Sequence, residues 1–181
     1  MIDEIMEYNR KFVENKGYEP YLTSKYPDKK LAILTCMDTR LLELLPTALG
    51  IKNGDAKIIK NAGGVIVHPY GSVVRSLLVG ILELGVEEVM VIGHTDCGVQ
   101  GMDGSEMLEK LVERGIDQQH IDIVRHSGID LERWLGGFES VESSVHETVR
   151  RLKEHPLMPK NVRISGFIMD SATGELTRVE E

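Results

Sequence analysis

Short apolar runs that alternate with helical segments are the feature that most restricts how this chain can fold. Leu31–Thr35 and Val89–Ile92 are apolar at nearly every position, which is typical of strands buried on both faces of a parallel sheet. Ala56–Lys60 and Val162–Met169 are also predicted to be strands, and the turn 170–174 leads to a short terminal strand. The pattern predicts a single α/β domain over residues 1–181. Its central sheet has about four parallel strands plus an antiparallel edge strand, and helices flank it.

Helical spacing of apolar residues marks the segments between these strands. Helices are predicted at 41–49, 71–84, 105–114, in part of 117–134 with a break at 127–128, and at 141–155. Pro46 predicts a kink or a late start in the first of them, because proline has no backbone N–H donor. The segment from Gly71 to Leu84 is almost wholly apolar, so we expect a buried helix that ends at Gly85.

The N-terminal stretch, residues 1–28, is predicted to form a helical arm. Its apolar residues recur at near-helical intervals up to Asn15, namely Ile2, Ile5, Met6, Tyr8 and Phe12. A loop from Gly17 to Asp28 follows. A helix that precedes the first strand needs an apolar surface to cover, which is either its own sheet or a partner subunit.

The charge balance makes several classes of partner improbable. The chain carries 21 Lys and Arg against 29 Asp and Glu, a formal net charge of -8. We therefore expect neither a nucleic-acid groove nor a basic membrane-binding surface. The longest apolar stretch, 72–84, is interrupted by Arg75 and Glu83, so no segment is predicted to span a bilayer. The acidic N-terminus is unlike a secretory signal, and the predicted location is the cytoplasm.

Two groups of chemically reactive residues follow the first and third predicted strands. The sequence C-M-D-T-R at 36–40 comes after one strand, and G-H-T-D-C-G at 93–98 comes after the other. In open α/β sheets, ligand sites form beyond the carboxyl ends of the strands. If these two strands are neighbours, Cys36, His94 and Cys97 converge. A disulfide between the two cysteines is not expected, because the cytosol keeps thiols reduced.

Two thiolates and one imidazole are a typical ligand set for zinc. Three protein ligands leave the fourth tetrahedral position open, which is the pattern of a catalytic rather than a structural zinc site. Asp38 is the candidate fourth ligand, yet it could instead pair bidentately with Arg40. When paired, it would stay ionised and accept a hydrogen bond from zinc-bound water. When released, it could occupy the open position and block the site. The sequence allows both states.

Simpler interpretations exist for each of these residues. The two cysteines could be unrelated buried thiols, and the carboxylate and guanidinium could form a purely structural ion pair. We expect the other histidines to lie at the surface or in loops, namely His68, His120, His126, His146 and His155. Met37 and Met90 are predicted to be core residues, and Trp134 to anchor packing or an interface. Neither G-x-x-x-x-G-K nor G-x-G-x-x-G occurs, so no nucleotide cofactor is expected.

At these residues the chain resembles the β-class carbonic anhydrases. The family pattern, C-x-D-x-R followed by H-x-x-C, is present at 36–40 and 94–97. The segment 60–64, K-N-A-G-G, is similar to the stretch between the two motifs, and 166–176 is similar to the last strands of the family. The resemblance extends from about residue 30 to 178 and is strongest to the compact prokaryotic clade.

The resemblance implies one zinc ion per subunit, held by Cys36, His94 and Cys97, with Asp38 and Arg40 as the pair that orients bound water. It implies reversible hydration of carbon dioxide to bicarbonate by a zinc-bound hydroxide. A homodimer or higher homo-oligomer is also implied, in which the N-terminal helix reaches across to the partner. An apolar cleft near the interface would then be lined by Val65, Ile66, Val67, Tyr70, Leu41 and Leu42.

Two other functions stay open at the level of sequence. The same zinc hydroxide could hydrolyse carbonyl sulfide or carbon disulfide, or zinc could merely stabilise the fold or an interface. A zinc ion with two thiolates has no net charge and acidifies its water less than a three-histidine centre, where the water pKa is about 7. Help from Asp38 and a somewhat alkaline optimum are therefore expected.

Overall fold

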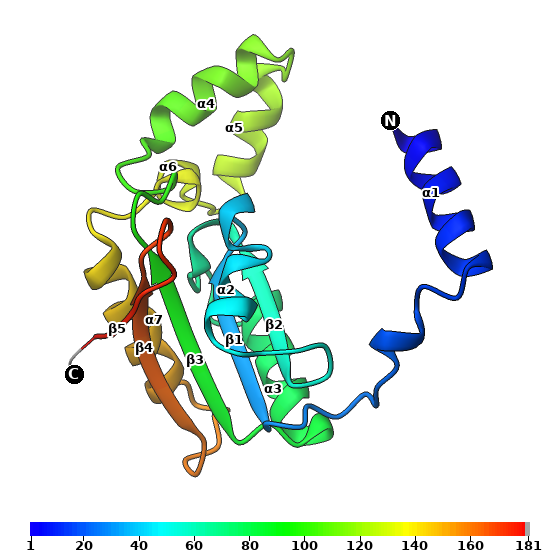
Figure 1. Cartoon of the computed structure of the whole chain (residues 1–181). Helices are drawn as coiled ribbons and strands as arrows, with labels where there is room; N and C mark the ends of the chain where they lie inside the picture. Colours follow the sequence, from blue (N-terminus) through cyan, green and yellow to red (C-terminus); the bar gives the residue numbers. More distant parts are fainter. Residues whose placement is uncertain (180–181) are drawn as a thin grey trace.

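A five-stranded sheet forms the centre of the molecule. The computed structural model describes residues 1–179, and its strands are β1 (Leu31–Cys36), β2 (Ala56–Asn61), β3 (Glu88–His94), β4 (Arg163–Met169) and β5 (Leu176–Arg178). They lie in the order β2-β1-β3-β4-β5 (Figure 1). The first four are parallel, and β5 pairs with β4 in the antiparallel sense. The predicted α/β architecture, with its antiparallel edge strand, is confirmed.

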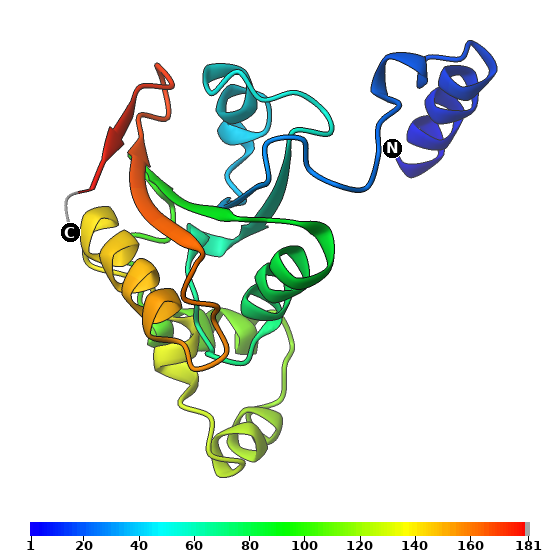
Figure 2. The same cartoon turned by 90° about the horizontal axis from the view of Figure 1, so that it is seen from below.

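Helices cover both faces of this sheet. One face carries α3 (Ser72–Leu84) and α7 (Val141–Glu154), and the other carries the 3-10 helix η2 (Thr39–Leu41) and α2 (Leu44–Ala48) (Figure 2). Alternate residues of β1 therefore enter different buried clusters. Ala32 and Leu34 pack with α3 and α7, whereas Ile33 packs with η2 and α2. Because helices cover both faces of the sheet and exclude water from them, the central strands have continuous apolar sequences.

Three helices between β3 and β4 form a separate small cluster, namely α4 (Gly104–Glu113), α5 (Gln118–His126) and α6 (Leu131–Leu135). In Figure 1 they extend beyond the end of the sheet at which β3 finishes. Leu108, Ile121 and Leu131 form the buried centre of this cluster. The side chains of Asp103 and Asp117 accept hydrogen bonds from the first backbone N–H groups of α4 and α5, which fixes where these helices begin.

Two glycines allow α7 to lie directly on the strands. A Cβ atom at Gly93 would lie 2.7 Å from Val141 Cγ1, and one at Gly166 would lie 2.6 Å from Val145 Cγ1. These distances are below van der Waals contact, so a side chain at either position would displace the helix. Gly93 immediately precedes His94, and this packing therefore also holds the end of β3.

The N-terminal arm consists of α1 (Ile2–Glu14), the short 3-10 helix η1 (Glu19–Tyr21) and the loop that leads into β1. Figures 1 and 2 show α1 standing away from the sheet, and none of its residues is buried. Ile2, Ile5 and Met6 are all exposed. The predicted helix forms, but its apolar side does not cover its own sheet.

Across residues 1–179, no helix is both long enough and apolar enough to pass through a membrane.

Two expectations about the helices need adjustment. The sequence predicted a kink or a late start at Pro46. The late start occurs, because α2 begins at Leu44 and Pro46 lies inside it. The helix α3 is not buried all round, because only Val74, Leu77 and Gly80 of it are buried and Leu82 is 67% exposed. The exposed positions combine the apolar Val79 and Leu82 with Arg75, Ser76 and Glu83, and the high apolar content of the segment as a whole concealed this more polar side.

Two side chains lie opposite to expectation. Met37 is 64% exposed rather than part of the core, because it follows β1 at the point where Cys36 turns inward. His155 is buried rather than at the surface, since both ring nitrogens have backbone partners. Its Nδ1 accepts from the N–H of Leu157 at 3.2 Å, and its Nε2 donates to the carbonyl oxygen of Pro69 at 2.9 Å. The other four histidines are exposed, and Met90 packs partly against the core.

Candidate metal centre

The carboxyl ends of β1 and β3 meet at one edge of the sheet. The two strands are adjacent and parallel, with Thr35 paired to Ile92, so Cys36 lies beside the end of β3 at His94. Cys97 follows three residues later, after a tight loop in which Asp96 has a φ of 53°. The ligand atoms of the two cysteines and the histidine all lie within 4.8 Å of one another. The fold thus brings together the three side chains that the motifs single out.

The donor geometry fits a tetrahedral metal ion. The Sγ atoms of Cys36 and Cys97 are 3.9 Å apart. Two thiolates on one zinc ion, each at about 2.3 Å, would be about 3.8 Å apart at the tetrahedral angle. The cysteines are not joined by a disulfide, and all three ligand residues are buried. The sulfur separation therefore matches a shared metal ion without any movement of the backbone.

His94 supplies the second test of fit. Its Nδ1 lies 2.8 Å from the carbonyl oxygen of Thr95, which can only accept, so Nδ1 carries the proton and Nε2 has a free lone pair. This Nε2 is buried and has no hydrogen-bond partner within residues 1–179. An unpaired buried polar atom costs about 1–3 kcal/mol. A metal ion would satisfy it, and the Nδ1 contact is the kind that orients metal-bound histidines.

The protonation of the Cys97 thiol gives the site a pH dependence. Burial raises the pKa of the Cys97 thiol above its ordinary value. The metal-free thiol is therefore neutral at physiological pH, and a cation binds by displacing its proton. Metal affinity should consequently fall as the pH falls.

Asp38 and Arg40 form the pair that the sequence suggested. The Nε of Arg40 donates to Asp38 Oδ1 at 3.0 Å, and its Nη2 donates to Asp38 Oδ2 at 2.9 Å. The backbone N–H of Arg40 also donates to Oδ1 at 2.9 Å. These bonds hold the pKa of Asp38 well below its usual range. The carboxylate is thus ionised, and its Oδ2 lies 3.9 Å from Nε2 of His94, at the edge of the ligand cluster.

A further partner of Arg40 was not predicted from the sequence. The Nη1 of Arg40 donates to Asp96 Oδ2, and its Nη2 donates to the carbonyl oxygen of Asp96, both at 2.8 Å. Asp96 lies inside the H-x-x-C motif, but an aspartate in a tight loop is common without any contact of this kind. The contact depends on the left-handed backbone at this residue, and a backbone conformation of this kind cannot be predicted from residue types alone.

The loop after β2 closes against the metal cluster. Asn61 holds it by a donated bond to the carbonyl oxygen of Val65 at 2.7 Å and an accepted bond from the N–H of Val65 at 3.1 Å. Gly64 has a φ of 66°, and a Cβ there would lie 3.0 Å from the backbone nitrogen of Cys36. The glycine is required by both constraints. The K-N-A-G-G segment therefore serves to bring backbone close to Cys36.

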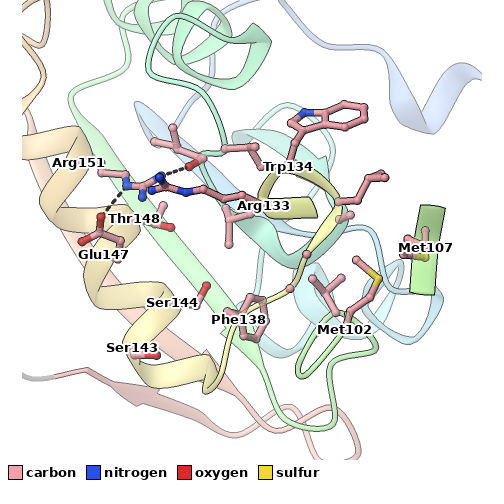
Figure 3. A pocket seen from close by; sticks show the side chains of 18 of the residues that line it. Met102, Met107, Arg133, Trp134, Phe138, Ser143, Ser144, Glu147, Thr148 and Arg151 are labelled. Carbon is pink, nitrogen blue, oxygen red and sulfur yellow. Dashed lines mark hydrogen bonds and ion pairs between the residues drawn. The ribbon is translucent and has the colours of Figure 1, made fainter. Parts of the chain in front are cut away.

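A cavity of about 730 Å³ lies between α6, α7 and the segment 62–67 (Figure 3). Its wall is mainly apolar, and Met102, Trp134 and Phe138 surround it. Val99 connects the cavity with the metal centre. It lines the cavity and also packs against the buried cluster that contains Cys97.

Half of the predicted apolar lining belongs to this cavity. Val65, Ile66 and Val67 line it, as expected. Leu41 does not, because η2 places it in the core on the opposite face of the sheet. Leu42 and Tyr70 are exposed elsewhere, and the ring of Tyr70 packs on the edge of His155. Sequence proximity to the motifs could not show on which face of the sheet these residues lie.

Comparison with known proteins agrees with this geometry. The family model described as carbonic anhydrase matches residues 31–176, a span that contains every ligand candidate. The chain belongs to the β-class carbonic anhydrase family. Hydration of carbon dioxide is the general activity of this family, and it depends on zinc.

Three similar proteins illustrate the range of the family. YvdA of Bacillus subtilis, provisionally named a carbonic anhydrase, is 53% identical over 97% of this chain and 89% of its own length. The structure of a β-carbonic anhydrase from Trichomonas vaginalis has a TM-score of 0.88 and 35% identity, covering 99% of this chain and 97% of that one. A carbon disulfide hydrolase of Acidithiobacillus thiooxidans is 31% identical over 82% of this chain and 76% of its own length.

Proposed function

We propose that this chain is a zinc-dependent carbonic anhydrase that converts carbon dioxide and water reversibly to bicarbonate and a proton. Cys36, His94 and Cys97 would hold the zinc ion. The buried Nε2 of His94 carries the proposal, because it has no hydrogen-bond partner among residues 1–179 and lies in a cluster with two thiols. Bound zinc would supply a Lewis acid that lowers the pKa of a coordinated water molecule.

Asp38 would orient the reacting water. An ionised carboxylate can only accept hydrogen bonds, and Arg40 keeps Asp38 ionised. Its Oδ2 lies at the edge of the ligand cluster, 3.9 Å from His94 Nε2. A water molecule held there would turn one hydrogen toward Asp38 and leave an oxygen lone pair free for the carbon of carbon dioxide. The hydrogen bonds between Asp38 and Arg40 support this role, because they would hold the carboxylate away from the position that it could block.

The mainly apolar part of the cavity, apart from the charged Arg133, Glu147 and Arg151 that also line it, would favour an uncharged substrate. Carbon dioxide has no net charge or dipole and loses little on leaving water, whereas bicarbonate loses its hydration. Val99 and Phe138 give the side of the metal cluster that faces the cavity an apolar surface. We infer that these side chains admit carbon dioxide and favour the departure of the charged product.

The decisive experiment measures turnover in zinc-loaded protein. Stopped-flow hydration of carbon dioxide, followed with a pH indicator from pH 7 to 9, should show activity that a chelator abolishes and zinc restores. Activity should rise toward alkaline pH, because a zinc ion with two thiolates acidifies water weakly. Absence of chelator-sensitive turnover over this range in a zinc-replete sample would exclude the proposal.

Asp38→Asn is the sharpest variant for this mechanism. Asparagine has nearly the same shape, but it is uncharged and presents only one acceptor oxygen. We expect the variant to retain zinc and to lose about 10- to 100-fold in kcat, the usual effect of removing a partner that orients a metal-bound group. Metal analysis together with stopped-flow kinetics checks both expectations. Asp122→Asn is a control, since Asp122 lies on α5 with its side chain 48% exposed, and its variant should match the wild type.

Hydrolysis of carbon disulfide or carbonyl sulfide is the second candidate. The observation that favours it is the 31% identity to a carbon disulfide hydrolase over 82% of this chain. Both activities would use the same three ligands. Parallel assays of hydrogen sulfide release and carbon dioxide hydration separate them, and sulfide release with little carbon dioxide turnover would select this alternative.

We further propose that the chain works as a homodimer in the cytoplasm. The exposed apolar side of α1 and the exposed Leu82 of α3 are surfaces that a second copy would bury. The cytoplasmic location is supported by the two free thiols, which are only 3.9 Å apart and would be lost as ligands if oxidised.

A zinc ion that merely stabilises the fold would require a different result, namely zinc with Asp38 bound at every pH and no turnover.

A further inference from the structure

We propose that Asp96 is a positioning residue, which fastens Arg40 so that Asp38 stays out of the open position of the metal. The proposal rests on the metal site proposed above. It assigns a role to a residue that is neither a ligand nor part of the Asp38–Arg40 pair.

The guanidinium of Arg40 lies between two carboxylates. Its Nε and Nη2 donate to Asp38 at 3.0 and 2.9 Å. Its Nη1 donates to Asp96 Oδ2 at 2.8 Å, and Nη2 also donates to the carbonyl oxygen of Asp96 at 2.8 Å. The guanidinium therefore makes two bonds on each side, and Arg40 joins the loop after β1 to the loop after β3.

The backbone of Asp96 makes this double contact achievable. Its φ of 53° lies in the left-handed region, which aspartate tolerates better than most residues. Its own carbonyl oxygen and its carboxylate thereby reach the same guanidinium. Asp96 also lies between the ligands His94 and Cys97, so this contact ties Arg40 to the segment that would hold the metal.

The second anchor changes what Asp38 can do. If Arg40 were bound to Asp38 alone, the two side chains could swing together toward the metal, because the Arg40 side chain is 41% exposed. With Arg40 fastened to Asp96, Asp38 can reach the metal only by breaking its bonds to a fixed guanidinium. Asp96 thus stabilises the open state relative to the blocked state without touching the metal, the water or the substrate.

Two variants isolate this role. Asp96→Gly keeps the left-handed backbone and its carbonyl oxygen but removes the carboxylate, whereas Asp96→Asn keeps an acceptor oxygen. Lys30→Gly is a matched control. Lys30 also has a left-handed φ, 51°, and an exposed ion pair, with Glu87 at 2.6 Å. It joins β1 and β3 at the opposite end of the sheet, before each strand begins.

The readout is the accessibility of the fourth metal position. Proteins loaded with cobalt(II) in place of zinc are titrated with azide, and binding is followed by the visible absorption of the metal. Azide needs the open position, so a larger blocked fraction raises its apparent Kd. Because Asp96 is an exposed carboxylate, we expect Asp96→Gly to raise this Kd about twofold to fivefold. Asp96→Asn should show a smaller rise, and Lys30→Gly should show none.

Kinetics give an independent comparison. With zinc bound, Asp96→Gly should lower kcat for carbon dioxide hydration by a similar factor with little change in KM, because fewer molecules are open. An unchanged azide Kd in Asp96→Gly would overturn the proposal. Loss of cobalt from that variant would overturn it too, because Asp96 would then support the ligand loop itself. The azide titration does not depend on turnover, so it tests the clamp even if the wild-type protein hydrates no carbon dioxide.

Discussion

At the scale of single residues, His94 shows how one side chain can prepare a metal site. Its Nδ1 is fixed by the carbonyl oxygen of the next residue, Thr95, and its Nε2 is buried with no hydrogen-bond partner in the described part of the chain. The protein without metal therefore carries an unsatisfied group beside two thiols whose Sγ atoms lie 3.9 Å apart. The proposed zinc ion would complete the fold in this region.

Metal removal should consequently lower the stability of the fold. Zinc at 100 times its Kd would add about 2.7 kcal/mol to the free energy of unfolding. Differential scanning fluorimetry at neutral pH should show a higher Tm with zinc than with chelator. The difference should shrink as the pH is lowered, because the pKa of Cys97 is raised by burial and protons compete with the ion. His94→Gln should abolish the difference, and an undiminished zinc effect in that variant would contradict the assignment of His94.

The motifs made the ligand residues predictable, but not every contact of the site. Cys36, His94 and Cys97 follow two strands whose type the sequence shows clearly, and parallel strands bring their carboxyl ends together. Asp96 could not be assigned in the same way. Its contact with Arg40 depends on a backbone angle and on the separation of two loops, neither of which is encoded by a residue pattern.

At the scale of elements, the contact of α7 with β3 and β4 depends on the absence of side chains. Gly166→Ala would place a methyl group 2.6 Å from Val145 Cγ1. We expect the variant to lose about 1–3 kcal/mol of unfolding free energy, as overpacked cores do. Urea denaturation of the metal-free protein measures this. Gly98→Ala is the control, because its added methyl group would meet no atom within 4 Å, and equal losses in both variants would contradict the packing argument.

The ion pairs on α7 predict a second property of this helix. Hydrogen bonds from Arg150 and Arg151 lower the pKa of Glu147 to about 2. Its pKa is lower in the folded state than in the unfolded state. Its contribution is therefore complete above the unfolded value of 4.5 and is lost as the pH falls toward 2. Because the side chain is 39% exposed, the effect should be no more than about 1 kcal/mol.

Comparison of Glu147→Gln with the wild type at pH 7 and pH 3 tests this sign. The difference in unfolding free energy should be larger at pH 7 than at pH 3. Glu106→Gln in α4 serves as the control, since Glu106 has a single pair, with Lys110 at 3.8 Å, and is 68% exposed. A loss at pH 3 as large as that at pH 7 would show that Glu147 acts by packing rather than by charge.

At this scale, the positions of the strands could be predicted from the sequence more reliably than the burial of each side of a helix. Apolar runs identified β1 and β3, because burial on both faces leaves an unambiguous pattern, whereas the edge strand β5 was predicted from the turn at 170–174 that leads to it. The same reasoning misplaced the outer side of α3, whose Leu82 is exposed. An apolar side chain at a surface has the same sequence signature as one in a core, and only the position of the neighbouring element tells them apart.

At the scale of the whole molecule, the N-terminal arm is the part whose apolar side is not buried within a single chain. The helix α1 buries none of its residues, yet its sequence is strongly amphipathic. An isolated helix of this length is only marginally stable in water unless packing supports it. The proposed homodimer would supply that packing.

Charged substitutions on the arm test the assembly. Ile5→Asp combined with Met6→Asp places two carboxylates on the apolar side of α1. We expect the dimer Kd to rise at least about tenfold, since each buried apolar side chain contributes about 1.5–3 kcal/mol. Light scattering after size exclusion should then report a lower mass. Lys11→Asp, on the polar side, should leave the mass unchanged, and a monomeric wild type would refute the dimer.

The helical cluster α4–α6 offers a site at which a label or a solid support could be attached to this protein. By Cys97 the chain has supplied its last candidate ligand, and it re-enters the sheet only at Arg163. The turn 115–117 lies in between, where Gly115 has open space around it and Ile116 is exposed. A tether, fluorescent reporter or solid support grafted at this turn would sit on an outlying helical cluster with its own small core, and the reaction centre would not be disturbed.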